Sequence, residues 1–220
     1  MVPTGALNRW LWIAVLVAIV VLGFKTRDRI DILFARVGSL DVIDEPERGA
    51  VLLKWTGAIE APMASRIAEA YAQHRATAKV FILSLSSPGG TLNQGGEVAR
   101  LLREISTTHR LETTVEDGAR CASMCVPVYL QGQRRSAAPD AQFMFHEVSF
   151  SEIGTEGDLK VPESARARET DRLFDRYFPA AGVPADWIAK TRADMAGGHD
   201  VWKSARELVD EKAGIVQELF

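Results

Sequence analysis

The chain has 220 residues, of which 25% are charged and 47% are hydrophobic, a composition typical of one globular domain with a short appendage. The net charge of −3 gives no attraction for a polyanion, which argues against nucleic acid as a partner. The sequence holds only two cysteines, too few for a structural zinc site, and we expect neither a metal nor a cofactor.

The appendage lies at the N-terminus. A tail over residues 1–9 precedes an unbroken apolar run over residues 10–24, WLWIAVLVAIVVLGF. This run is shorter than the ~20 residues that cross a bilayer core, but Trp10, Trp12 and the flanking basic side chains suit the membrane interfaces. A cleaved signal peptide has a similar length but needs a small-x-small cleavage site, which is not evident here, and a buried core helix is the other alternative. We expect an uncleaved single-pass transmembrane anchor.

The charges around this run and the cysteines give opposite indications about the side of the membrane. Lys25, Arg27, Arg29 and Arg36 follow the run, whereas Arg9 alone precedes it. The positive-inside rule therefore predicts a domain in the cytoplasm. The two cysteines favour an oxidising compartment, because disulfides persist there.

The segment over residues 25–48 is charged and mixed, so we expect a linker there and a folded domain over residues 49–220. Within that domain, short apolar β-rich runs alternate with segments that have helical apolar spacing. This alternation predicts an α/β domain with parallel strands. Strands are expected over 50–55, 80–85, 111–115 and 142–146, a loop over 149–160, and helices over 61–76, around 98–105, and over 162–178, 184–190 and 204–212.

The third expected strand leads into a stretch of small and apolar residues over residues 118–130, GARCASMCVPVYL. The pattern predicts a strand, a sharp turn and a helix, with Ser123 at the start of the helix. A serine at such an elbow exposes its hydroxyl beside free backbone N–H groups, which suits a nucleophile and its oxyanion. The alternative is a serine that only caps the helix.

Four motifs follow one another along the chain: Ser87-Pro88-Gly89-Gly90, Ala122-Ser123-Met124, Phe143-Met144-Phe145-His146, and the stretch DVWKSARE that begins at Asp200. Their order and spacing resemble those of ClpP, the proteolytic subunit of the Clp protease, and its membrane-associated relatives. The resemblance covers residues 50–219. It implies the ClpP/crotonase fold, built of repeated β-β-α units, and a Ser-His-Asp hydrolase.

The resemblance also implies roles for individual residues. Ser123 matches the nucleophile, His146 the general base and Asp200 the acid of the family. A serine hydroxyl is a weak nucleophile until a base takes its proton, and a carboxylate fixes the tautomer of a histidine that does so. The backbone N–H groups of Gly90 and Met124 match the oxyanion hole, where each donor is typically worth about 3 kcal/mol.

Alternatives stay open at these positions. Asp194 is a rival for the acid, a serine–lysine dyad like that of SppA is a rival for the triad, and His146 is otherwise a structural histidine at a strand end. Cys121 and Cys125 flank Ser123, where the family has small residues. On a helix they share a face, and they would form a strained disulfide, stay reduced in the core, or sense the redox state.

The first function that we infer is a membrane-anchored serine endopeptidase with peptide or protein substrates. A non-catalytic ClpP-like module that binds peptides or scaffolds a membrane complex is the second, and a crotonase-type acyl-CoA enzyme is the third. Relatives with one anchor resemble exported bacterial proteins, so we favour the bacterial inner membrane with the domain on the periplasmic side. The resemblance also implies a homo-oligomer, with contacts made by the insertion between His146 and Asp200.

Overall fold

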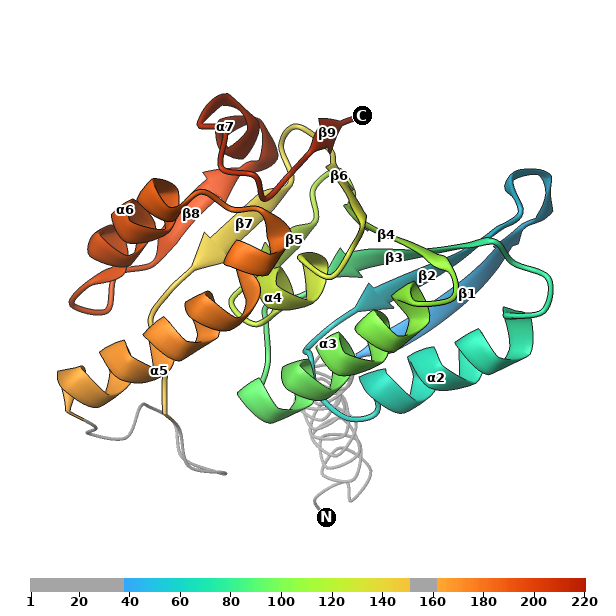
Figure 1. Cartoon of the computed structure of the whole chain (residues 1–220), viewed down its shortest axis with the longest axis horizontal. Helices are drawn as coiled ribbons and strands as arrows, with labels where there is room; N and C mark the ends of the chain where they lie inside the picture. The colour runs from blue at the N-terminus through green and yellow to red at the C-terminus, as the bar shows by residue number, and fades with distance from the viewer. Residues whose placement is uncertain (1–37, 151–161) are drawn as a thin grey trace, which may run out of the picture. The chain divides into compact units, whose positions relative to one another are not determined.

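The framework of the described residues, 38–150 and 162–220, is a set of nine strands in a computed structural model (Figure 1). The expected tail, the expected anchor over residues 10–24 and most of the expected linker lie outside the described residues, as does most of the expected loop. The strands are β1 (Ser39–Glu45), β2 (Ala50–Thr56), β3 (Val80–Ser86), β4 (Arg110–Val115), β5 (Arg120–Ala122), β6 (Arg134–Ala137), β7 (Gln142–Phe145), β8 (Val201–Ser204) and β9 (Glu218–Leu219).

These strands form two sheets. The larger sheet has the order β1-β2-β3-β4-β6-β9, and the smaller one has the order β5-β7-β8. In the larger sheet every neighbouring pair is parallel except β1 and β2. The parallel pairs, with helices between them in the chain, confirm the expected α/β class.

Six α-helices connect or follow these strands. Within the described part of the chain they are α2 (Met63–His74), α3 (Leu92–Ser106), α4 (Cys125–Tyr129), α5 (Glu163–Tyr177), α6 (Ala185–Met195) and α7 (Ala205–Asp210). The same residues include two 3-10 helices, η1 (Pro46–Arg48) and η2 (Pro179–Ala181). Two strands precede a helix in β1-β2-α2, β4-β5-α4 and β6-β7-α5, which matches the expected β-β-α unit, whereas only β3 precedes α3. Within residues 38–150 and 162–220, no helix has the length and apolar character needed to cross a membrane.

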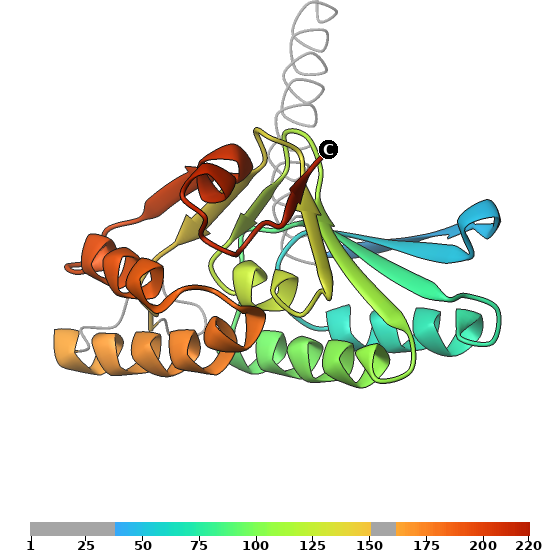
Figure 2. The ribbon, with the colours of Figure 1, turned by 45° about the horizontal axis from the view of Figure 1, so that its top comes forward.

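The core of the larger sheet lies under α2 and α3, which run side by side along one face of it (Figure 2). β3 illustrates why the strand prediction succeeds, because five of its seven residues, VFILSLS, are buried. Phe81, Leu83 and Leu85 are at most 1% exposed. α3 turns its apolar stripe, including Val98 and Leu102, into the same core.

The expected start of the domain at residue 49 is wrong. β1 pairs with β2 from Ser39 opposite Thr56 to Glu45 opposite Ala50, and the compact unit begins at Gly38. Gly38 lies against the ring of the buried Trp55, where any larger residue would overlap the indole. β1 is an edge strand with mostly exposed side chains, so its sequence is as polar as that of a linker.

Candidate active site

Ser123 occupies the turn between β5 and α4, as the sequence predicts, but it precedes the helix instead of starting it. The helix begins at Cys125, and Met124 is its N-cap residue. Ser123 has φ 53°, a left-handed conformation that is uncommon for a residue with a side chain and that clusters at functional sites. Its N–H donates to the Met144 carbonyl at 2.9 Å, and its carbonyl accepts from the Val126 N–H at 3.0 Å.

The Ser87–Gly90 loop lies directly against this elbow. Isolated parallel β-bridges pair the backbone of Ser87 with Cys121 and that of Ile59 with Gly90. A Cβ on Gly89 would lie 2.7 Å from the Ser123 Cβ, and a Cβ on Gly90 would overlap the Ile59 carbonyl. Glycine is therefore required at both positions, because the backbone of the loop approaches its neighbours too closely for a side chain.

His146 follows the last residue of β7, and its Nε2 lies 2.7 Å from the Ser123 Oγ. The pairing of β5 with β7 places Ala122 opposite Met144, so both chains reach the site at the same end of the smaller sheet. The Ser123 hydroxyl makes no capping hydrogen bond to α4. The interpretation of Ser123 as a capping serine is therefore wrong, and the serine and histidine form a hydrogen-bonded dyad.

Asp200 stands immediately before β8, the strand that pairs antiparallel with β7. Phe145 is opposite Val201, so the register continued by one residue places Asp200 opposite His146. The Asp200 side chain is exposed, and no carboxylate oxygen of the described residues lies within 4.0 Å of the His146 ring. Its rival Asp194 lies on α6 and pairs with Lys190 Nζ at 2.9 Å.

The two N–H groups that the resemblance assigns to an oxyanion both border Ser123. Neither the Gly90 N–H nor the Met124 N–H donates to an acceptor within the described part of the chain. The Met124 side chain packs onto α3 at Gly95, where a Cβ would overlap it. This contact anchors the residue whose N–H follows the serine.

A cavity of about 420 Å³ opens over Ser123 and His146. Most of its remaining wall is apolar, and the apolar lining includes Leu92, Val126, Phe145, Leu173, Phe174 and Phe178. Glu60 is the one acidic residue among the described lining residues, and no lysine lines the cavity there. Among the described residues, the cavity therefore offers no lysine for a serine–lysine dyad.

Sequence reasoning missed Glu60, because nothing in its local sequence distinguishes it from a surface carboxylate. One carboxylate oxygen accepts from the Thr91 N–H at 2.9 Å, and the other accepts from the Thr91 hydroxyl at 3.3 Å. Thr91 is also the N-cap residue of α3. Glu60 therefore holds the start of α3 beside Gly90.

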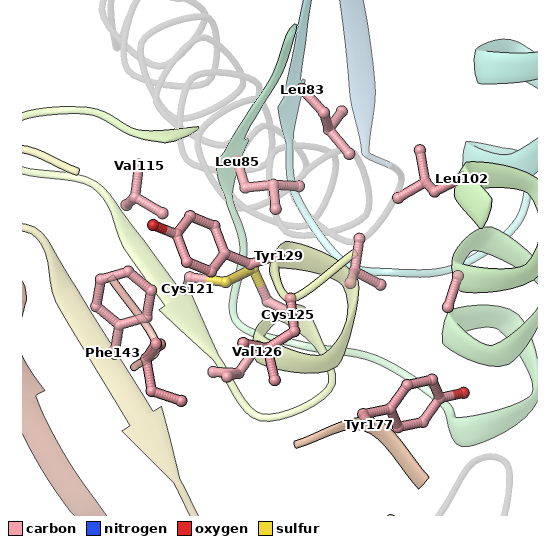
Figure 3. Close-up of a cluster of buried hydrophobic side chains, with 14 of the residues drawn as sticks. Leu83, Leu85, Leu102, Val115, Cys121, Cys125, Val126, Tyr129, Phe143 and Tyr177 are labelled. Carbon is pink, nitrogen blue, oxygen red and sulfur yellow. A yellow bond between two sulfur atoms is a disulfide. The ribbon is translucent and has the colours of Figure 1, made fainter. Parts of the chain in front are cut away.

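The cysteines form a disulfide between Cys121 in β5 and Cys125 at the start of α4, with 5.1 Å between their Cα atoms. Of the three outcomes open from the sequence, the structure shows the bonded pair. Both residues are 0% exposed. Figure 3 shows the bridge within the core, beside Tyr129.

A serine hydrogen-bonded to a histidine, near two backbone N–H groups that have no acceptor among the described residues, is the arrangement of a serine hydrolase. The sequence profile described as "Clp protease" matches residues 51–220. The chain therefore belongs to the Clp protease family, and it is a ClpP-like serine-type peptidase.

A solved structure supports the fold. A mutant of ClpP1 from Listeria monocytogenes matches with a TM-score of 0.57 and 21% identity, covering 80% of this chain and 92% of that chain. At this identity the match shows the shared fold. No curated protein matches the chain.

Proposed function

We propose that the chain is a membrane-anchored endopeptidase that cleaves peptide bonds with a Ser123-His146-Asp200 triad. The observation that carries the proposal is the 2.7 Å hydrogen bond between His146 Nε2 and the hydroxyl of Ser123, a serine held in a left-handed backbone conformation. Such geometry presents the hydroxyl to a substrate while the base already contacts its proton.

In the proposed reaction, His146 Nε2 takes the hydroxyl proton as Ser123 Oγ attacks the scissile carbonyl carbon. The N–H groups of Gly90 and Met124 receive the oxyanion. His146 then gives its proton to the leaving amine, which leaves an ester on Ser123. Water, activated by the same histidine, hydrolyses this ester and regenerates the serine.

Asp200 completes the triad in this proposal by accepting a hydrogen bond from His146 Nδ1. The β7–β8 register supports the assignment, because the next residues after its last pair, Phe145–Val201, are His146 and Asp200. Gly197 and Gly198, both at φ 84°, lie shortly before Asp200, and glycine adopts many backbone conformations at little steric cost. Catalytic hydrogen bonds that are long in a free enzyme commonly tighten when substrate binds.

The cavity supports a peptide substrate with an apolar side chain next to the cleaved bond. Its wall combines Leu92, Leu173 and Phe174 with a polar floor formed by Ser123 and His146. Assembly into a homo-oligomer, as the family suggests, belongs to the same proposal.

We also propose that residues 10–24 tether the peptidase to the bacterial inner membrane with the domain on the periplasmic side. The apolar sequence of this run supports the anchor. The Cys121–Cys125 disulfide supports an oxidising compartment. Alkaline extraction of membranes, followed by protease treatment of intact and permeabilised spheroplasts, tests both parts.

The experiment that tests the function is cleavage of a defined mixture of synthetic peptides, read by mass spectrometry. The purified full chain should generate new peptide termini, and the Ser123→Ala variant should generate none. A non-catalytic module predicts no cleavage by either protein. A crotonase-type enzyme predicts turnover of acyl-CoA that survives Ser123→Ala.

A further inference from the structure

The disulfide encloses two residues of the proposed site, the nucleophile and one oxyanion donor. Ser123 and Met124 lie between Cys121 and Cys125, so the bridge closes a small ring of chain around the nucleophile and one oxyanion donor. Cys121 belongs to β5, and Cys125 is the first residue of α4. The ring therefore links the strand before the elbow to the helix after it.

We propose that the Cys121–Cys125 disulfide is a positioning device for catalysis, which holds Ser123 in its reactive conformation, so that the peptidase is fast when oxidised and slow when reduced. This inference rests on the proposed function. It adds to the proposed triad a covalent link that fixes the conformation of Ser123.

The elements on both sides of the elbow are short. β5 has three residues and α4 has five, so neither gains much from its own hydrogen-bond ladder. Between them, Ser123 holds φ 53°, which L-residues disfavour. A covalent link across the turn removes the alternative conformations that such a segment would otherwise sample.

Reduction would displace one side of the ring more than the other. β5 is held on both edges, because Cys121 is opposite Phe143 in β7 and also bridges to Ser87. The Ser87 N–H donates to the Arg120 carbonyl at 2.7 Å, and the Ala122 N–H donates to the Ser87 carbonyl at 3.0 Å. Movement therefore falls on the α4 side of the turn.

The burial of the sulfur atoms favours such a movement. Non-bonded heavy atoms settle roughly 3.5–4 Å apart, so two thiols need more room than a bonded pair. Cys121, Cys125 and the neighbouring Tyr129 are each 0% exposed, so the bridge lies within the core, away from solvent (Figure 3). Separation of the sulfurs would shift Cys125, and with it the Met124 N–H and Ser123.

The geometry also fixes the sign of the effect. With the disulfide formed, Ser123 Oγ lies 2.7 Å from His146 Nε2, and the Met124 N–H is unused within the described chain. The oxidised form thus has a hydrogen-bonded dyad. Reduction should lower the rate, and it should not release a blocked nucleophile.

The test compares oxidised and reduced forms of the same full chain with a fluorophosphonate probe, which reacts at an activated serine. Because the bridge is buried, the chain is unfolded in denaturant with dithiothreitol and refolded without oxidant. The dithiol supplies two electrons and two protons, the S–S bond breaks, two thiols form, and the reagent closes its own disulfide. Circular dichroism and thermal melting establish that both forms are folded.

We expect the limiting rate of Ser123 labelling to fall about tenfold or more on reduction, equivalent to about 1.4 kcal/mol, with unchanged probe affinity. Reoxidation should restore the rate, which a general loss of structure would not allow. A Cys121→Ala/Cys125→Ala variant is the matched control without thiols. It should label at the slow rate whether or not reductant is present.

Equal limiting rates for the oxidised, reduced and double-alanine proteins would overturn the positioning role of the disulfide while leaving the proposed function intact. Absence of labelling in the oxidised chain would overturn the proposed function, and the positioning role of the disulfide with it. If the reduced chain does not refold, the double-alanine variant decides the comparison. Loss of the fold in both would also overturn the proposal, because the bridge would then support the whole domain instead of positioning the nucleophile.

Discussion

Ser123 is held at the elbow by neighbours on three sides. Its N–H is bonded to β7, its hydroxyl to His146, and its Cβ lies against the backbone of Gly89. No one of these contacts is unusual, but together they hold a serine in a conformation that serine disfavours. The strained residue is therefore the one that carries the proposed chemistry.

The proposed acid gives the first prediction at this scale. Asp200→Asn should lower the probe-labelling rate by about 10²–10⁴-fold, because an amide neither fixes the His146 tautomer nor stabilises the imidazolium. Asp194→Asn is the matched control, since Asp194 pairs with Lys190 on α6 and should leave the rate unchanged. The reverse pattern in stopped-flow or gel-based labelling would make Asp194 the acid.

Gly90 gives the second prediction. Gly90→Ala should slow labelling by about 10²–10³-fold, because its Cβ would overlap the Ile59 carbonyl and move an oxyanion donor. Gly118→Ala is the control: unlike Gly90, Gly118 has a positive φ, 64°, and a Cβ there would meet only open space. That variant should lose about 1 kcal/mol of stability and keep its rate. Similar rates for the two variants would remove Gly90 from the site.

At the scale of elements, the α7 capping box predicts a dependence of stability on pH. The Ser204 N–H and hydroxyl donate to the Glu207 carboxylate at 2.7 Å each, and this lowers the pKa of Glu207. Because the pKa of Glu207 is lower in the folded state, the ionised carboxylate stabilises the fold at pH values above the ordinary glutamate pKa of about 4.3. This contribution to stability is lost as the pH falls through the folded-state pKa.

The wild-type chain should therefore melt at a higher temperature than Glu207→Gln at neutral pH. The difference should shrink below about pH 4, as the wild-type carboxylate becomes protonated. Thermal melts of both proteins across this range measure the effect. A difference that stays constant with pH would show that the Glu207 charge contributes nothing through the cap.

The lengths of the strands explain which of them the sequence pattern could predict. β2, β3 and β4 have six or seven residues each, long enough for their β-rich and largely buried character to be predictable. β5, β6, β8 and β9 have two to four residues, too few for any periodicity to appear. β8 matters most, because its pairing with β7 ends at Val201 and Phe145, the residues next to Asp200 and His146, and no local pattern indicates that pairing.

The site was more predictable than the elements around it. Ser123 and His146 were predicted to meet because a family resemblance fixed their roles, and the dyad forms. The position of Ser123 before α4, the Glu60 contact to Thr91 and the choice among the cysteine alternatives were not predictable. Each depends on backbone paths and packing, which one sequence does not specify.

At the scale of the whole molecule, the domain boundary gives the next prediction. A chain that begins at Gly38 keeps β1 and the residue that covers Trp55, so its labelling rate should equal that of the full chain. A chain that begins at Gly49 loses both. It should lose at least about 2 kcal/mol, seen as a melting temperature lower by about 4–8 °C. Equal melting temperatures would show that β1 is dispensable.

The central claim is that His146 activates Ser123 as a nucleophile. The most direct measurement is mass-spectrometric mapping of the residue that a fluorophosphonate probe modifies in the oxidised full chain. The account predicts an adduct on Ser123, absent from Ser123→Ala and formed about 10³-fold more slowly in His146→Gln. An adduct on another residue, or a rate that His146→Gln leaves unchanged, would contradict it.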